Sequence, residues 1–142
     1  MDFDSIENLY EYLDKECMPE IKKEVTRKTL NIFFRRMKTD VYGAFKPKVY
    51  KRRGFSNGGF GDPTNIRTLN TRDSLIIEDV AKANGDDKGE DLAYYIENGI
   101  YGWKRKPPKR PIFEDTMNEV MVTGVVRKSI EEILGKMNIE VK

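Results

Sequence analysis

The segment Leu92–Phe113 places the strongest limit on the fold, because it contains three prolines. Proline has no backbone N–H and its ring clashes inside a helix, so no helix can run through Pro107 and Pro108. Pro111 can still begin a helix, since the first helical position needs no donor. On the other side, Gly99 is an expected left-handed helix stop. The segment predicts a short helix, an extended basic stretch and a C-terminal helix.

The C-terminal helix is predicted from a periodic apolar face and from Glu114 and Asp115 in its first turn, where acids favour the positive helix end. Gly124 would then lie in mid-helix at a cost of about 1 kcal/mol relative to alanine, which indicates a close neighbour or a kink. The apolar face comprises Phe113, Met117, Val120, Met121, Ile130, Ile133, Leu134 and Met137.

The N-terminal region predicts helix from Asp4, read as an N-cap with Glu7 as its capping-box partner. Pro19 either kinks this helix or begins a second one. A second apolar stripe continues towards Val41, and Gly43 offers a stop.

Asn65–Leu69 and Ser74–Ala81 predict two strands of a hairpin, since they are short apolar runs separated by turn-forming residues. The predicted fold class is α+β. It has two N-terminal helices or one kinked helix, a small antiparallel sheet with a central hairpin, a short helix, a long C-terminal helix and an extended basic glycine-rich arm. A length of 142 residues predicts a single domain, 1–142, from which segments 44–63 and 100–111 protrude.

The chain has no histidine and one cysteine, which argues against disulfides, the usual zinc sites and Ser-His or Cys-His nucleophile pairs. We therefore expect no enzyme, no cofactor and no bound metal. The acidic N-terminus lacks a signal peptide and no apolar run approaches ~20 residues, so we expect no membrane contact and synthesis in a reducing cytoplasm.

The net charge is only +2, but bases concentrate in Lys46–Arg53 and Lys104–Arg110. Such asymmetry is typical of surfaces that meet charged partners. The first basic run continues into a glycine-rich stretch that is not a phosphate loop, because Gly61 is followed by Asp62-Pro63 instead of Lys-Ser/Thr. We interpret Phe45–Asp62 either as an arm that orders on a partner or as an ordinary long loop.

Acidic residues are dense in Asp86–Asp91, without the alternating ligand spacing of a calcium loop. The favoured interpretation is a helix cap, with Asp87 as N-cap and Glu90 as its capping-box partner.

Several short motifs, taken together in order, resemble a known family. Tyr95-Ile96-Glu97-Asn98-Gly99 and Arg110-Pro111-Ile112-Phe113 are similar to motifs of the tail-completion or head–tail joining (neck) proteins of long-tailed bacteriophages. Tyr50-Lys51-Arg52-Arg53, Gly58-Gly59-Phe60 and Asn65-Ile66 look like the version found in phages of low-GC Gram-positive bacteria. Ile100 and Ile112 depart from the family pattern, which leaves open the choice among tail completion, minor tail protein and another neck ring.

The resemblance implies a structural virion protein that forms a ring, a hexamer or dodecamer, between the head connector and the tail tube. Its implied partners are further copies of itself, portal-adaptor or other neck proteins, tail terminator or tail tube proteins, and non-specifically bound double-stranded DNA in the channel. Assembly would take place in the host cytoplasm and the final location would be the virion.

In such a ring we expect three sets of residues to matter. Contacts with neighbouring subunits or the adjoining ring are expected from Phe45, Lys48, Tyr50, Arg52, Arg53, Phe60, Trp103, Lys104, Arg105 and Arg110. Contacts with channel DNA are expected from Lys46, Lys51, Lys106 and Lys109. The structural motif residues are Tyr95, Ile96, Glu97, Gly99, Arg110, Pro111 and Phe113.

Two other classes stay open at this point. The same basic and aromatic segments could serve a nucleic-acid-binding module, which the modest net charge disfavours. A metal nuclease built on carboxylates would have to use them, lysine or tyrosine for every proton transfer. Its candidate residues are Glu78, Asp79, Asp86, Asp87, Glu90 and Asp91.

Overall fold

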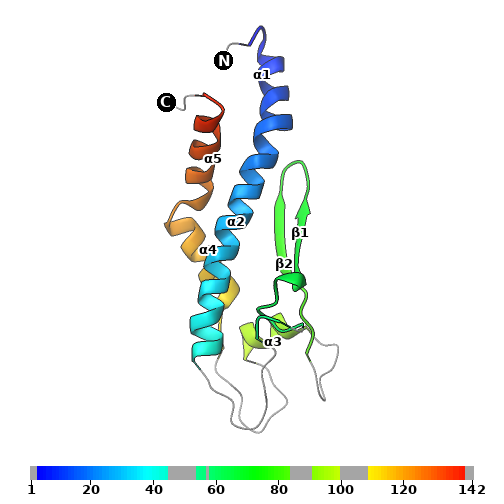
Figure 1. The fold of residues 1–142 in the computed structure, drawn as a ribbon, viewed down its shortest axis with the longest axis vertical. Helices are drawn as coiled ribbons and strands as arrows, with labels where there is room; N and C mark the ends of the chain where they lie inside the picture. The colour runs from blue at the N-terminus through cyan, green and yellow to red at the C-terminus, as the bar shows by residue number, and fades with distance from the viewer. Residues whose placement is uncertain (1–2, 45–53, 57, 84–90, 100–108, 140–142) are drawn as a thin grey trace. The chain divides into compact units, whose positions relative to one another are not determined.

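The computed structural model describes residues 3–44, 54–56, 58–83, 91–99 and 109–139 (Figure 1). In these residues, helices precede and follow one antiparallel hairpin, which confirms the α+β class. The elements are α1 (Ile6–Tyr12), α2 (Met18–Arg36), β1 (Ile66–Asn70), β2 (Leu75–Asp79), α3 (Leu92–Asn98), α4 (Ile112–Val122) and α5 (Val125–Lys136). None of the helices described is both long and apolar enough to cross a membrane.

The chain separates into two compact units, and its course passes from the first to the second and back. Unit 1 contains Met1–Ile32 and Met117–Lys142, and unit 2 contains Phe33–Thr116. The boundaries fall inside α2 and α4, so each of these helices contributes to both units. The single domain expected from chain length stays a prediction.

The N-terminal helical region runs from Ile6 to Gly43, and two stretches of it are π-helical. The N-cap is Ser5, whose side chain accepts a 3.2 Å hydrogen bond from the Asn8 N–H, so the prediction of Asp4 as the cap was wrong. The first π-helical stretch ends just ahead of Pro19, whose ring would clash with a carbonyl in a regular helix. The wider π-helical turn thus lets the helix continue through the proline.

Unit 1 has its own apolar cluster, built by the N-terminal helical region and α5. Cys17, Ile21 and Ile133 are buried in it, and the Cys17 Sγ lies 3.1 Å from the Met137 Sδ. In the same unit, Lys28 Nζ lies 2.8 Å from a carboxylate oxygen of Glu132, and this ion pair joins α2 to α5.

The predicted long C-terminal helix is two helices, because Gly124 adopts a left-handed conformation with φ of 65°. The break at Gly124 also explains why the predicted apolar face of the C-terminal helix was wrong. Met117 and Met121 were expected on one apolar face, yet both are exposed, Met121 to 74%. The buried positions of α4 are Ile112, Thr116 and Val120, spaced four residues apart. Because the helix is broken at Gly124, the buried face of α5 does not have to continue that of α4.

Unit 2 contains a regular two-stranded antiparallel hairpin, as the sequence predicts to within a few residues at each strand end. Ile66 pairs with Asp79 at one end and Asn70 with Leu75 at the other. The turn is closed by the Thr71 N–H, which donates to the Ser74 carbonyl at 3.0 Å.

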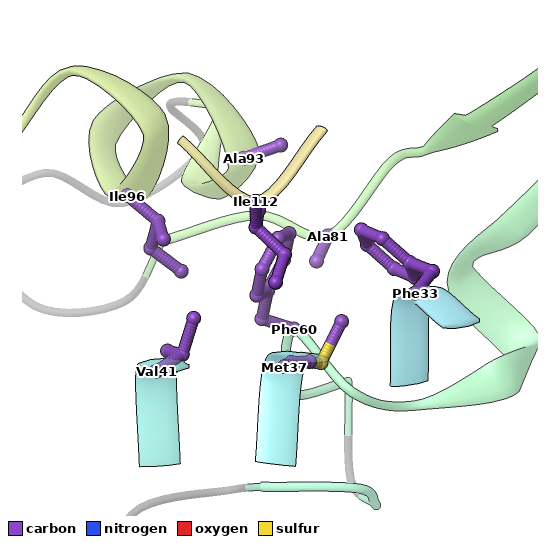
Figure 2. Packing of buried hydrophobic residues seen from close by; sticks show 8 residues of the cluster. All are labelled: Phe33, Met37, Val41, Phe60, Ala81, Ala93, Ile96 and Ile112. Carbon is purple, nitrogen blue, oxygen red and sulfur yellow. The ribbon is translucent and has the colours of Figure 1, made fainter. Parts of the chain in front are cut away.

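The unit 2 core gathers side chains from segments far apart in sequence. Figure 2 shows them converging: Phe33, Met37, Val41, Phe60, Ala81, Ala93, Ile96 and Ile112. Beside them, the ring of Phe113 lies 5.2 Å from that of Phe33 and 6.1 Å from that of Phe60, between centroids. Phe33 and Phe60 meet edge to face at 5.8 Å. Phe60, predicted to contact a neighbouring subunit, and Phe113, predicted as a structural motif residue, therefore lie in one cluster.

Candidate functional site: the junction of α3 and α4

The short helix α3 is fixed at both ends by local chemistry. Asp91 is its N-cap and accepts a 3.1 Å hydrogen bond from the Ala93 N–H, so the prediction of Asp87 as N-cap was wrong. Glu90 and Asp87 themselves lie outside the described residues. At the other end Gly99 has φ of 65° and its N–H donates to the Tyr95 carbonyl, which confirms the predicted stop.

Glu97 joins the end of α3 to the start of α4. Its carboxylate accepts hydrogen bonds from the backbone N–H groups of Phe113 at 3.1 Å and Glu114 at 3.3 Å. The first N–H groups of any helix lack intrahelical partners, and the positive end of the helix dipole favours a negative charge there. Glu97 therefore acts as a remote N-cap for α4.

A backbone hydrogen bond reinforces this junction: the Arg110 N–H donates to the Ile96 carbonyl at 3.2 Å. Ile96 is buried in the unit 2 core, where it secures α3 from the other side. The two motifs that the sequence singled out, Tyr95–Gly99 and Arg110–Phe113, are thus bonded directly to one another. The chain leaves this junction at Gly99 and returns to it at Arg110.

The predicted contact residues between those two points are only partly placed. Trp103, Lys104, Arg105 and Lys106 lie outside the described residues. Lys109 is exposed, whereas Arg110 is half-buried and its Nε has no hydrogen-bond partner among the residues described. Pro111 immediately precedes α4, and its carbonyl accepts from the Asp115 N–H at 2.9 Å.

The glycine-rich stretch, where it is described, folds onto its own chain. The Tyr42 hydroxyl donates to the Gly54 carbonyl at 3.0 Å and accepts from the Gly61 N–H at 3.2 Å. The ring of Phe55 packs against that of Tyr42. A Cβ added at Gly61 would come within 2.6 Å of the Phe55 ring, so a larger residue here would force that ring to move.

Asp62 closes the same loop from inside. Its carboxylate accepts from the Thr64 hydroxyl at 2.7 Å and from the N–H groups of Gly58 and Thr64, both at 2.9 Å. These hydrogen bonds, that of the Thr64 side chain first, lower the pKa of Asp62. Sequence reasoning missed this role, although an aspartate directly before Pro63 is a recognisable helix-cap signal.

Phe60 requires a correction. It was expected to contact a neighbouring subunit, but its side chain is only 1% exposed and belongs to the core of its own chain. An aromatic in a glycine-rich stretch can anchor the loop to its own domain as well as to a partner, and sequence does not separate the two cases. The other predicted contact residues of this stretch, Phe45, Lys46, Lys48, Tyr50, Lys51, Arg52 and Arg53, lie outside the described residues.

Asp79 is a buried carboxylate at the base of the hairpin. It is 7% exposed, and one oxygen accepts from the Ala81 N–H at 2.8 Å while the other has no hydrogen-bond partner within the described part of the chain. Burial raises the pKa of Asp79 to about 7, the negative charges of Asp91 and Asp62 add to this, and the Ala81 N–H opposes it. Among the described residues no group of three or more acidic, cysteine or histidine side chains is arranged to hold a metal ion.

These features define a small α+β protein, and a family model that matches residues 5–136 assigns it to a phage-derived class. The chain belongs to the YomN family. The resemblance noted from sequence is thereby confirmed in its coarser part, a phage-derived family, while the neck position stays a prediction. No curated protein and no solved structure matches the chain significantly.

Proposed function

We propose that the chain is a structural, non-catalytic virion protein that forms a ring in the head–tail connector of a tailed phage. In this role it joins the head connector to the tail tube and surrounds the DNA channel. The observation that carries the proposal is the junction of α3 and α4, where Glu97 and the Arg110 N–H hold together the two ends of a basic segment.

The junction supports this role for a physical reason. A binding segment loses less conformational entropy on docking when its ends are already fixed, and prolines reduce the loss further. The segment between Gly99 and Arg110 contains Trp103, four cations and two prolines, which are suited to a contact that combines an aromatic anchor with opposite charge. Membership in a phage-derived family supports the proposal, because the partners available to such a contact would include other phage proteins.

The test neutralises the basic segment without touching the junction. Arg110 is left intact, because its side chain is half-buried and its loss could disturb the fold. The variant carries Lys104→Gln, Arg105→Gln, Lys106→Gln and Lys109→Gln, and it replaces the wild-type gene in the phage that carries it. We expect DNA-filled heads and tails to accumulate separately, counted by electron microscopy, while the purified variant melts within about 0.5 kcal/mol of the wild type.

A matched control removes four cations elsewhere. Lys15, Lys23, Arg127 and Lys136 are exposed in unit 1, and each forms an ion pair with a carboxylate three or four residues away, so their loss changes the net charge equally at little cost in stability. We expect this control to join heads and tails normally. Normal joining in the basic-segment variant, or an equal defect in the control, would contradict the proposed role.

A further inference from the structure

The hairpin of unit 2 presents apolar side chains to solvent near its tip. Leu69 on β1 and Ile76 on β2 lie directly opposite one another, and they are 54% and 48% exposed. An isolated two-stranded hairpin is marginally stable in water, and further strands or a packed face are needed to stabilise it. An additional strand alongside would extend this sheet, and its side chains would pack beside Leu69 and Ile76.

Both outer edges of the hairpin are free for pairing within the part of the chain that is described, where the sheet has two strands. The Val80 N–H donates to the Asn65 carbonyl and the Thr71 N–H donates to the Ser74 carbonyl. These two hydrogen-bonded pairs at the ends of the ladder determine which pairs between them are hydrogen-bonded and which are not. It follows that Thr68 and Ile77, an opposed pair at the middle of the ladder, direct their N–H and C=O groups outwards, one on each edge.

The two edges carry opposite charge on the same face. Arg67 on β1 is opposed by Glu78 on β2, next to the Leu69–Ile76 pair. Natural proteins protect exposed strand edges with proline, bulges or charged side chains, above all lysine. The charges of Arg67 and Glu78 are opposite in sign, so they would attract the complementary edge of another copy. Neither strand contains a proline or a lysine, and their five pairs run without interruption.

We propose that a second copy of this chain occupies the edge, with β2 of one copy pairing antiparallel to β1 of the next. In the register that repeats the pairing within the hairpin, Thr68 of one copy exchanges hydrogen bonds with Ile77 of the other. Glu78 then faces Arg67 and Ile76 faces Leu69 between copies, as they do within one copy. Such a head-to-tail contact propagates into a closed ring when its rotation closes, so this inference rests on the proposed function and names its interface.

Two-fold pairing of like edges is less complementary. With β2 paired to β2 about Ile77, each Glu78 would oppose Ile76, and with β1 paired to β1 about Thr68, each Arg67 would oppose Leu69. Pairing about Glu78 would oppose two like charges, which is destabilising. The charges therefore favour the head-to-tail arrangement.

The first test blocks one edge at a time with proline, which removes an outward N–H that the hairpin itself does not use. Thr68→Pro blocks the β1 edge and Ile77→Pro blocks the β2 edge. We expect the wild-type chain to self-associate in a concentration-dependent way and each variant alone to associate on the order of tenfold more weakly. An equimolar mixture should form a 1:1 dimer, because each variant retains the edge that the other lacks. Molar mass by light scattering reads out all three samples.

The control is Thr68→Val, which keeps the N–H and the β-branched shape and should associate like the wild type. Self-association of Thr68→Pro at wild-type strength would overturn the hairpin contact. So would a wild-type chain that stays monomeric at the highest concentration it tolerates.

A second test does not depend on how the proline variants fold. Arg67→Cys and Glu78→Cys are prepared as separate proteins, one with a longer tag, and are mixed under mild oxidation. We expect the mixed-tag dimer to be the main product, while Cys17, which is buried, gives none in the unsubstituted chain. Dimers between identical variants as the main product would show like-edge pairing and overturn the proposal.

The two proposals fail separately. A phage carrying Thr68→Pro that still joins heads to tails would remove the hairpin contact and leave the connector role intact. A basic-segment variant that joins normally, combined with mixed-tag cross-linking, would remove the connector role and leave the hairpin contact intact.

Discussion

At the scale of single residues, two carboxylates behave oppositely because their surroundings differ. Asp62 has its oxygens satisfied by three donors, which favour the charged form and lower its pKa. Asp79 is equally buried but has one oxygen without a described partner, and burial raises its pKa to about 7. Desolvation and hydrogen bonding therefore act in opposite directions: desolvation dominates at Asp79 and raises its pKa, whereas the three donors dominate at Asp62 and lower its pKa.

The raised pKa of Asp79 predicts a pH dependence with a definite sign. Between an unfolded pKa of about 4 and the folded value of about 7, the native state holds a proton that the unfolded state has lost. The free energy of unfolding contributed by Asp79 is then fully present below about pH 4 and is lost as pH rises through about 7. Asp79→Asn should remove this loss and stabilise the protein by up to about 4 kcal/mol at pH 8, while its amide oxygen keeps the Ala81 contact.

The measurement is urea denaturation of both proteins across this pH range, because the difference between them cancels the contribution of Asp62. Parallel stability curves for the two proteins would show that Asp79 titrates at its ordinary pKa.

At the scale of elements, helix boundaries follow from backbone conformation that only glycine adopts readily. Gly99 ends α3 and Gly124 separates α4 from α5, both with φ of 65°. At Gly99 the stop was readable because a turn-forming asparagine precedes it and a proline-rich segment follows. At Gly124 apolar periodicity on both sides resembled one continuous helix, so the left-handed turn was not predicted.

Two glycines of the C-terminal region offer a matched pair of substitutions. Neither Gly124 nor Gly135 has any atom within 4 Å of an added Cβ, so space is equal and only backbone conformation differs. Gly124→Ala should destabilise the protein by about 1 kcal/mol, the cost of a left-handed non-glycine residue. Gly135→Ala, inside α5, should stabilise it by up to about 1 kcal/mol, because it lowers the entropy of the unfolded chain.

Thermal melting of both variants measures whether the two substitutions change the stability in opposite directions. If Gly124→Ala is stabilising as well, α4 and α5 form the continuous helix that the sequence indicated.

At the scale of the whole molecule, two apolar clusters divide the chain into units that share two helices. One cluster centres on Phe60 and Met37, the other on Cys17 and Ile133. Because each cluster is built from its own residues, a cavity in one should weaken local protection there first.

Phe60→Ala should cost about 3–5 kcal/mol and Ile133→Ala about 2–5 kcal/mol. Native-state hydrogen exchange should then show faster opening of Phe33–Thr116 in the first variant and of Met1–Ile32 with Met117–Lys142 in the second. Equal acceleration throughout the chain in both variants would mean that the two units unfold as one.

The sequence by itself determined the hairpin, the stop at Gly99 and the helix that begins directly after Pro111. Each of these depends on backbone preferences of a few neighbouring residues, which sequence spacing reports directly. Only the tertiary structure decided that Phe60 is buried, that Glu97 caps a helix sixteen residues away and that Asp79 holds its proton near neutral pH. Those properties depend on which distant groups exclude water or supply donors, and local spacing does not encode them.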